Sequence, residues 1–158
     1  MTIDLQPIAP AHAAVLAAMH RICFAEPWDE KAMSELLAMP GAFGFLAAPK
    51  PGEAHPQGFI LCRTAGDEAE VLTVLVLPPC RRRGVATALL ARATEMAGQA
   101  GATVLFLEVA ADNDSARHLY STQGFEQVGC RPRYYGNAID ALVMKRSLAM
   151  EAGEVMPS

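Results

Sequence analysis

A basic, glycine-containing turn is the part of the chain best suited to bind a ligand. An apolar run over residues 71–77 ends at Pro78 and Pro79, and the sequence Arg-Arg-Arg-Gly-Val-Ala then opens an amphipathic stretch. A helix that starts here presents unpaired backbone N–H groups and the positive end of its dipole. Gly84 lets the backbone approach a ligand closely, and Ala86 adds almost no bulk. The turn therefore predicts a site for an anion with several oxygens, such as a pyrophosphate, built from Arg81, Arg82, Arg83, Gly84, Val85 and Ala86. The alternative is a strand-to-helix turn with a solvated basic patch.

Two residues further along the chain could transfer protons. Glu108 is the lone acid in the apolar run 104–109, which makes it a candidate general base. The alternative is a charge at a strand edge or a structural acid held in an ion pair. Tyr120 lies on a predicted helix and projects from the face of Ala116 toward the sheet, where a phenol can donate a proton. A core aromatic with a satisfied hydroxyl group is the commoner role for a tyrosine.

The elements that must position these residues alternate between strands and helices. Asp29 is the predicted N-cap of the second helix, and Gly98 and Gly101 indicate where the third helix ends. Interleaved elements of this kind favour an α/β or α+β class around a mixed sheet. We expect one domain over residues 1–148, followed by a disordered tail over 149–158. Periodicity predicts helices over 10–24, 29–39, 84–100 and 114–123, and strands over 2–6, 42–48, 58–64, 70–77, 103–109, 125–130 and 139–146.

Composition excludes several classes of protein. With 158 residues, 52% of them hydrophobic, the chain is long and apolar enough for a full core. The net charge of −4 argues against broad nucleic-acid binding, although it allows a local basic patch. Four cysteines without a C-x-x-C pair predict reduced thiols in a cytoplasmic protein, and with four histidines they form no ligand pattern for a metal. The first residues lack the basic start of a secretory signal, and the longest apolar stretch near the N-terminus, 36–49, is too short to span a membrane.

Three segments together resemble the GNAT family, the Gcn5-related N-acetyltransferases. Residues 81–86 fit the Gln/Arg-x-x-Gly-x-Gly/Ala turn of that family. Residues 113–120, Asn-Asp-Ser-Ala-Arg-His-Leu-Tyr, followed by Gly124 and Phe125, fit its Asn-x-x-Ala-x-x-Leu-Tyr and Gly-Phe block. The strand segment Leu-Glu-Val at 107–109 lies upstream at the spacing of the family. The combination is far more specific than any one segment.

A closer similarity is to the RimI subgroup, the ribosomal-protein alanine N-acetyltransferases. Residues 20–30 look like its entry region, and residues 133–135 and 140–144 look like its C-terminal signature. The chain departs from the subgroup at Ala110, where relatives commonly carry arginine two residues after the strand glutamate. This departure leaves the handling of the acceptor near that position open.

The resemblance implies a GNAT-like fold, with a mixed and mostly antiparallel central sheet flanked by helices. It implies that acetyl-CoA is the co-substrate, with its pyrophosphate on the 81–86 turn and its pantetheine arm along the strand edge at Val74 and Val76. Asn113 would contact the cofactor; it could equally serve only as the N-cap of its helix. No metal is implied.

The resemblance also assigns chemical roles. Glu108 would take a proton from the acceptor amine, directly or through a water molecule, and Tyr120 would protonate the departing thiolate. The bulky side chains of Trp28, Tyr134 and Tyr135 would line the entrance for a peptide. Trp28 could instead pack as a hydrophobic staple, and the two tyrosines could be ordinary sheet residues.

The acceptor implied by the subgroup is the N-terminal α-amine of a protein, an alanine of a small-subunit ribosomal protein. A second hypothesis is a GNAT enzyme that acts on a small-molecule amine or on lysine. A third is a non-catalytic module that binds acyl-CoA, but such a module needs neither Glu108 nor Tyr120. The sequence leaves the oligomeric state open.

Overall fold

The computed structural model describes residues 3–135 and 139–148, with the backbone alone at 134 and 135. Within these residues the strands form one seven-stranded sheet in the order β1-β2-β3-β4-β5-β7-β6. All neighbouring strands are antiparallel except β4 and β5, which are parallel. The predicted mixed, mostly antiparallel sheet is thus confirmed. The strands are β1 (Leu5–Pro7), β2 (Ala42–Ala47), β3 (Gly58–Ala65), β4 (Glu68–Val76), β5 (Val104–Ala110), β6 (Glu126–Tyr135) and β7 (Ile139–Ser147).

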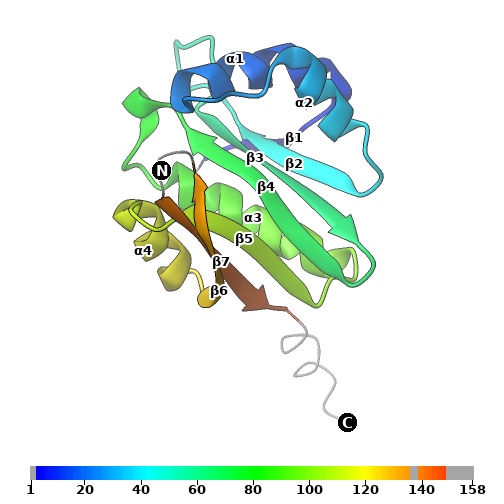
Figure 1. Ribbon diagram of the computed structural model, residues 1–158. Coiled ribbons are helices and arrows are strands. Elements are labelled where there is room, and N and C mark those ends of the chain that lie inside the picture. Colours follow the sequence, from blue (N-terminus) through cyan, green and yellow to red (C-terminus); the bar gives the residue numbers. More distant parts are fainter. Residues whose placement is uncertain (1–2, 136–138, 149–158) are drawn as a thin grey trace.

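Helices cover both faces of the sheet (Figure 1). One face packs against α1 and α2, around a core that includes Leu16, Met33 and Phe59. The other face packs against α3 and α4, around a core that includes Leu89 and Leu105. None of the helices in the described ranges has both the length and the apolar character needed to cross a membrane. The helices are α1 (Ala13–Cys23), α2 (Glu30–Leu37), α3 (Val85–Gln99) and α4 (Asp114–Thr122), with short 3₁₀ turns η1 (Pro10–His12) and η2 (Pro78–Cys80).

Local sequence signals explain where the helices begin. Asp29 is the N-cap of α2, as predicted, because its Oδ1 accepts a hydrogen bond from the Ala32 N–H at 2.8 Å. Gly84 precedes α3 with φ at +83°, a conformation that glycine adopts without strain. The apolar face of α3 is buried at Val85 and Ala93, as its spacing predicts.

Two strands differ most from their predicted bounds. The first strand, predicted over 2–6, lies at Leu5–Pro7, because its ladder with β2 pairs Leu5 with Ala47. The strand predicted over 125–130 continues to Tyr135. At the edge of the sheet, β6 can include Pro132, and two register shifts absorb the irregularity. The predicted tail at 149–158 lies outside the described residues.

The parallel strands β4 and β5 separate after a short pairing. Within the described residues their ladder consists of Glu68 with Val104, Ala69 with Leu105, and Glu70 with Phe106. The register between β3 and β4 shifts so that Leu72 is an extra residue on β4, and such a bulge bends a strand. We use the name fork for the two segments beyond this ladder, residues 71–76 of β4 and 107–110 of β5.

Candidate functional site

The β4 side of the fork offers main-chain groups to a ligand. Leu77 donates its N–H to the carbonyl of Gln57, the residue just before β3, at 2.9 Å. Main-chain groups of successive residues point to opposite edges of an antiparallel strand, so Val74 and Val76 point away from β3 and toward the fork. These are the two residues predicted to contact the pantetheine arm, and the contact itself stays a prediction.

The β5 side of the fork also has main-chain groups that point away from its neighbouring strand β7 and toward β4. Ala111 donates its N–H to the Asp140 carbonyl at 2.9 Å, which fixes the residues of β5 that pair with β7. By alternation, Glu108 and Ala110 direct their main-chain groups toward the fork, where the Ala110 carbonyl already accepts the Asn113 N–H at 3.0 Å. A slender polar chain that enters between β4 and β5 would therefore meet N–H and C=O groups from both strands.

The basic turn at the end of β4 has the geometry of an anion site. Arg82 and Gly84 both have positive φ, at 65° and 83°, so successive N–H groups can converge on one point. The first amides of α3, at Val85 and Ala86, have no acceptor within the helix. A Cβ atom built on Gly84 meets nothing within 4 Å, so the space beside the turn is open. Exposed side chains of Arg82 and Arg83 add positive charge, and the turn fits a pyrophosphate.

Arg81 has a different environment from the two arginines that follow it. Its Nε donates a hydrogen bond to the Val76 carbonyl at 2.8 Å, and its guanidinium lies 3.8 Å from the Cys23 sulfur of α1. Its side chain thus connects the end of β4 to the end of α1. Its guanidinium stabilises the position of the turn.

Two predicted site residues lie at α4: Asn113 precedes its first turn, and Tyr120 lies on its buried face. The Asn113 Oδ1 accepts a hydrogen bond from the Ala116 N–H at 3.1 Å, which makes Asn113 the N-cap of α4; the contact with a cofactor stays a prediction. Tyr120 is 7% exposed and belongs to the core cluster that contains Leu107 and Val109. The prediction that Tyr120 faces the sheet is therefore confirmed.

Glu108 lies on the opposite face of the sheet from Tyr120. Its neighbours on β5, Leu107 and Val109, point into the core cluster of Tyr120, and side chains alternate along a strand. The Glu108 side chain is 29% exposed, and its Oε2 lies 3.0 Å from the Arg131 Nε on β6. The fork thus lies between a carboxylate on one face of the sheet and a phenol on the other.

Sequence reasoning missed Arg131. In the strand register Ala110 lies opposite Ala141 of β7, and Ala141 lies opposite Arg131 of β6. Arg131 therefore belongs to the same row and the same face of the sheet as Ala110, the position where arginine was expected. No local signal could have found it, because the contact depends on the pairing of three strands.

The segment between α1 and α2 is held by a buried histidine. His20 is 3% exposed and stacks between Phe24 and Trp28, with ring centroids 4.2 and 4.7 Å away. Its Nδ1 accepts a hydrogen bond from the Trp28 N–H at 3.0 Å, and its Nε2 lies 3.4 Å from the Thr73 Oγ1 of β4. Burial lowers the pKa of His20. The sequence did not single out this histidine.

The predicted entrance residues are only partly described. Trp28 packs against the core cluster that contains Met33, so its structural role is established. A role of Trp28 in lining a peptide entrance stays a prediction. The side chains of Tyr134 and Tyr135 lie outside the described part of the structure.

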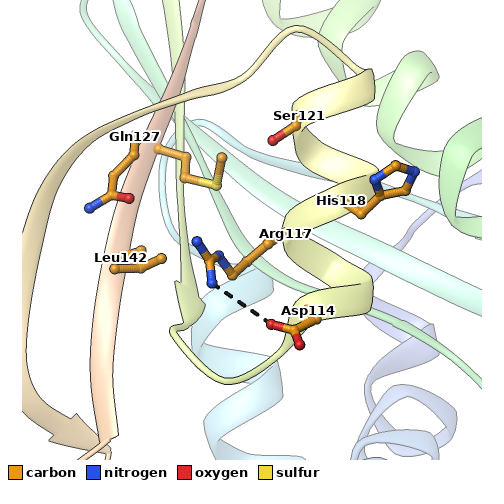
Figure 2. Close-up of a pocket in the computed structure, with 7 residues that line it drawn as sticks. Asp114, Arg117, His118, Ser121, Gln127 and Leu142 are labelled. Carbon is orange, nitrogen blue, oxygen red and sulfur yellow. Dashed lines mark ion pairs between the residues drawn. The ribbon is translucent and has the colours of Figure 1, made fainter.

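A shallow cavity of about 240 Å³ lies between α4 and the strands β6 and β7 (Figure 2). Arg117 and Asp114 form an ion pair of 3.8 Å at its wall. Leu142 and Met144 line it and belong to the core cluster on the Tyr120 face, so the cavity lies on the opposite face of the sheet from Glu108. It is not part of the fork. The lining residues are Asp114, Arg117, His118, Ser121, Gln127, Leu142 and Met144.

Sequence comparisons find relatives among acetyltransferases. The N-alpha-acetyltransferase RimI of Mycobacterium tuberculosis is 35% identical over 156 residues, which cover 92% of this chain and 96% of that protein. The ribosomal protein bS18-alanine N-acetyltransferase of Haemophilus influenzae is 36% identical over 91 residues, which cover 55% of this chain and 62% of that protein. A Mycobacterium leprae protein of uncharacterised function is 45% identical over 80 residues, which span only 21% of its length.

Solved structures share the fold. The ribosomal-protein-S18-alanine N-acetyltransferase of Escherichia coli superposes with a TM-score of 0.84 at 24% identity, covering 93% of this chain and 94% of that one. NAA60 of Arabidopsis thaliana in complex with acetyl-CoA gives a TM-score of 0.81 at 20% identity, covering 94% and 99%. The model of the Acetyltransferase (GNAT) family matches residues 14–125. Since this match spans the basic turn at 81–86, both sides of the fork and α4, the chain belongs to the GNAT family of acetyl-CoA-dependent N-acetyltransferases.

Proposed function

We propose that this enzyme acetylates the N-terminal α-amine of a protein, with Glu108 as general base and Tyr120 as general acid. The observation that carries the proposal is the fork with a carboxylate on one face of the sheet and a phenol on the other. A thioester held between β4 and β5 would have its carbonyl accessible from the Glu108 face. Its sulfur would lie toward the Tyr120 face.

The proposed reaction is a direct transfer. The amine nitrogen attacks the thioester carbonyl carbon, so that a C–N bond forms and the C–S bond breaks. Glu108 accepts the proton that the amine loses, directly or through water, and Tyr120 gives its phenolic proton to the departing thiolate. The pyrophosphate would bind the N–H groups of the 82–86 turn, and the pantetheine arm would follow the edge of β4 at Val74.

An N-terminal amine suits this site better than a lysine side chain. A free α-amino group has a pKa of about 7.7–8.0, against about 10.4 for lysine, so it needs less help to lose its proton. Glu108 is partly exposed and already contacts Arg131, so it is better suited to assist a weakly basic amine than a strongly basic one. The names of several relatives specify an alanine of ribosomal protein bS18, which makes a small N-terminal residue of a ribosomal protein our proposed acceptor.

Peptides that differ only in which amine is free test this function. One peptide starts with a free alanine and contains internal lysines that are chemically acetylated; its partner has an acetylated N-terminus and free lysines. We expect acetyl transfer to the first and little to the second, measured by mass spectrometry of the products. Equal rates on the two peptides would replace the N-terminal function with that of a lysine acetyltransferase, and activity on small amines alone would replace it with that of a small-molecule acetyltransferase.

A further inference from the structure

The Arg131–Glu108 ion pair is too exposed to contribute much to the stability of the fold. The Arg131 side chain is 57% exposed and that of Glu108 29% exposed. An ion pair this open to water contributes little to stability, because water screens the attraction and two side chains lose freedom. The pair also requires Arg131 to reach across β7, from the edge strand β6 to β5.

Small residues beneath the guanidinium make this reach possible. Across the three strands, Arg131 of β6 lies opposite Ala141 of β7, which lies opposite Ala110 of β5. In the neighbouring set of paired residues, which contains Glu108, the β6 position is Gly129. Val143 of β7, opposite Glu108, is the larger cross-strand neighbour, and the small residues at 110, 129 and 141 leave room for the arginine beside it. The long stem of Arg131 can therefore lie over β7 with its charged head beside Glu108.

We propose that Arg131 is a positioning residue of the acceptor site, which orients Glu108 and favours the neutral form of the acceptor amine; the inference rests on the proposed roles of the fork and Glu108. The ion pair uses Oε2, so the other carboxylate oxygen can accept a proton from the amine. A guanidinium beside Glu108 repels an ammonium group and thereby lowers the pKa of the bound amine. More of the acceptor is then present in the form that attacks.

The strand register identifies the neighbours of Glu108 on its face of the sheet. On β7, Val143 lies directly opposite Glu108, and Lys145 is the next residue on that face, opposite Glu126 of β6. On the β4 side, the His20 ring of α1 is directed at Thr73. Among the described residues, Arg131 is the cation in direct contact with Glu108.

The turnover number at saturating substrates reports proton transfers in the enzyme–substrate complex, so its pH profile tests this role. Arg131→Gln removes the charge, and the pKa of the bound amine should rise by about one unit. The acidic limb of the kcat profile then moves about one pH unit upward, and kcat on that limb falls roughly tenfold. At high pH the loss should be much smaller. Arg131→Lys keeps the charge and should return the limb toward its wild-type position.

Matched variants separate this role from a structural one. Arg117→Gln removes the same charge on the opposite face of the sheet and should leave the profile in place. Arg131→Met, which keeps the aliphatic stem, provides a second charge-free variant if Arg131→Gln folds poorly; thermal melting and calorimetry with acetyl-CoA establish that each variant is intact. A kcat profile of Arg131→Gln or Arg131→Met that runs parallel to the wild type at every pH would overturn the proposal.

The test does not depend on the identity of the acceptor. The profiles are recorded with whichever amine the wild-type enzyme acetylates best. A failure of the N-terminal proposal appears in the wild-type comparison of free and blocked peptides. A failure of the Arg131 proposal appears only in the difference between variants, so the two outcomes are distinguishable.

Discussion

At the scale of single residues, the anion site predicted at the basic turn 81–86 depends on backbone angles as well as on charge. Arg82 and Gly84 both adopt left-handed angles, which let several N–H groups face one ligand. Gly84 faces open space, so no neighbour in the protein requires it to be glycine. Its conformation and the expected closeness of the ligand are what a larger side chain would disturb.

Gly84→Val is expected to abolish tight binding of acetyl-CoA, because a branched side chain both resists φ at +83° and fills the space beside the turn. Isothermal titration calorimetry without added metal measures this loss. Gly52 is the matched control, since it has the same φ of +83° and also faces open space, in the loop between β2 and β3. Gly52→Val should bind acetyl-CoA normally; equal loss in both variants, or in neither, would remove the turn from the site.

The two proposed proton-transfer residues should respond differently to pH. Glu108→Gln should lose activity most at low pH and recover in part as the pH rises, because the amine then loses its proton without help. A general base is typically worth about 10²–10⁴-fold in rate. Steady-state kinetics with the alanine peptide across a pH range measures this. Near-normal rates at low pH would make Glu108 a structural ion-pair partner of Arg131.

Tyr120→Phe should lower kcat by a similar factor of about 10²–10⁴ while the affinity for acetyl-CoA stays nearly unchanged. The hydroxyl group is needed when the thiolate leaves, whereas the ring supplies the packing in the core cluster. Rapid-mixing kinetics gives the rate of transfer, and calorimetry gives the affinity. A normal rate would mean that the phenol is only part of the core.

At the scale of elements, α1 and α2 are connected through the stacked His20. The neutral ring accepts the Trp28 N–H and is buried, so protonation breaks a hydrogen bond and places a charge in the core. The pKa of His20 is lowered on folding, so the unfolded chain takes up the proton first as the pH falls. Stability is therefore complete above the ordinary histidine pKa of about 6.5 and declines below it.

We expect the melting temperature of the wild-type protein to fall between pH 7.5 and pH 5.5, with a smaller fall in His20→Gln, which has no ring to protonate. Each unit by which the pKa is lowered corresponds to about 1.4 kcal/mol. Thermal unfolding followed by circular dichroism measures the difference. His55→Gln, in an exposed loop, is the control and should keep the wild-type pH dependence. A fall in His20→Gln as large as in the wild type would contradict the assignment.

The N-cap of α4 can be separated from a contact with the cofactor. Asn113→Ala should cost about 1 kcal/mol of stability, because the Ala116 N–H loses its acceptor. Asn113→Ser restores a capping oxygen but lacks the amide group. If Asn113 also contacts acetyl-CoA, both variants should bind it more weakly while only the alanine variant loses stability. Unchanged affinity in both would leave Asn113 with the N-cap role alone.

Much of the element order follows from periodicity, whereas the register of the sheet does not. The helical spacing of α3 and the capping residue of α2 are local signals, and both are confirmed. The end of β6 was misplaced because Pro132, just beyond the predicted end, is a typical strand breaker, and its tolerance depends on an edge position in the sheet. Arg131 and His20 were missed for the same reason, since each acts on a strand or segment distant in the sequence.

At the scale of the whole molecule, the sheet consists of two parts that share a short seam. Strands β1 to β4 form one part and β5, β7 and β6 the other, and within the described residues the seam consists of three residue pairs. On the face that packs against α3 and α4 (Figure 1), one core cluster spans both parts, since it includes Ile60 of β3 and Leu142 of β7. A ligand that forms hydrogen bonds with both edges of the fork would link β4 and β5 where the two strands no longer pair with each other.

If acetyl-CoA bonds to both edges of the fork, the rigidity of the sheet at this seam should depend on its co-substrate. The amides of Val74 and Glu108 face the fork, whereas the Leu107 amide is bonded to β7. Acetyl-CoA should therefore slow hydrogen–deuterium exchange at Val74 and Glu108 and leave Leu107 little changed, as measured by NMR. Exchange rates that do not change at Val74 and Glu108 would mean that no ligand bridges the strands. If the ligand does bridge them, each turnover joins and then releases the facing edges of β4 and β5, and the enzyme passes through a more tightly and a less tightly coupled sheet in every catalytic cycle.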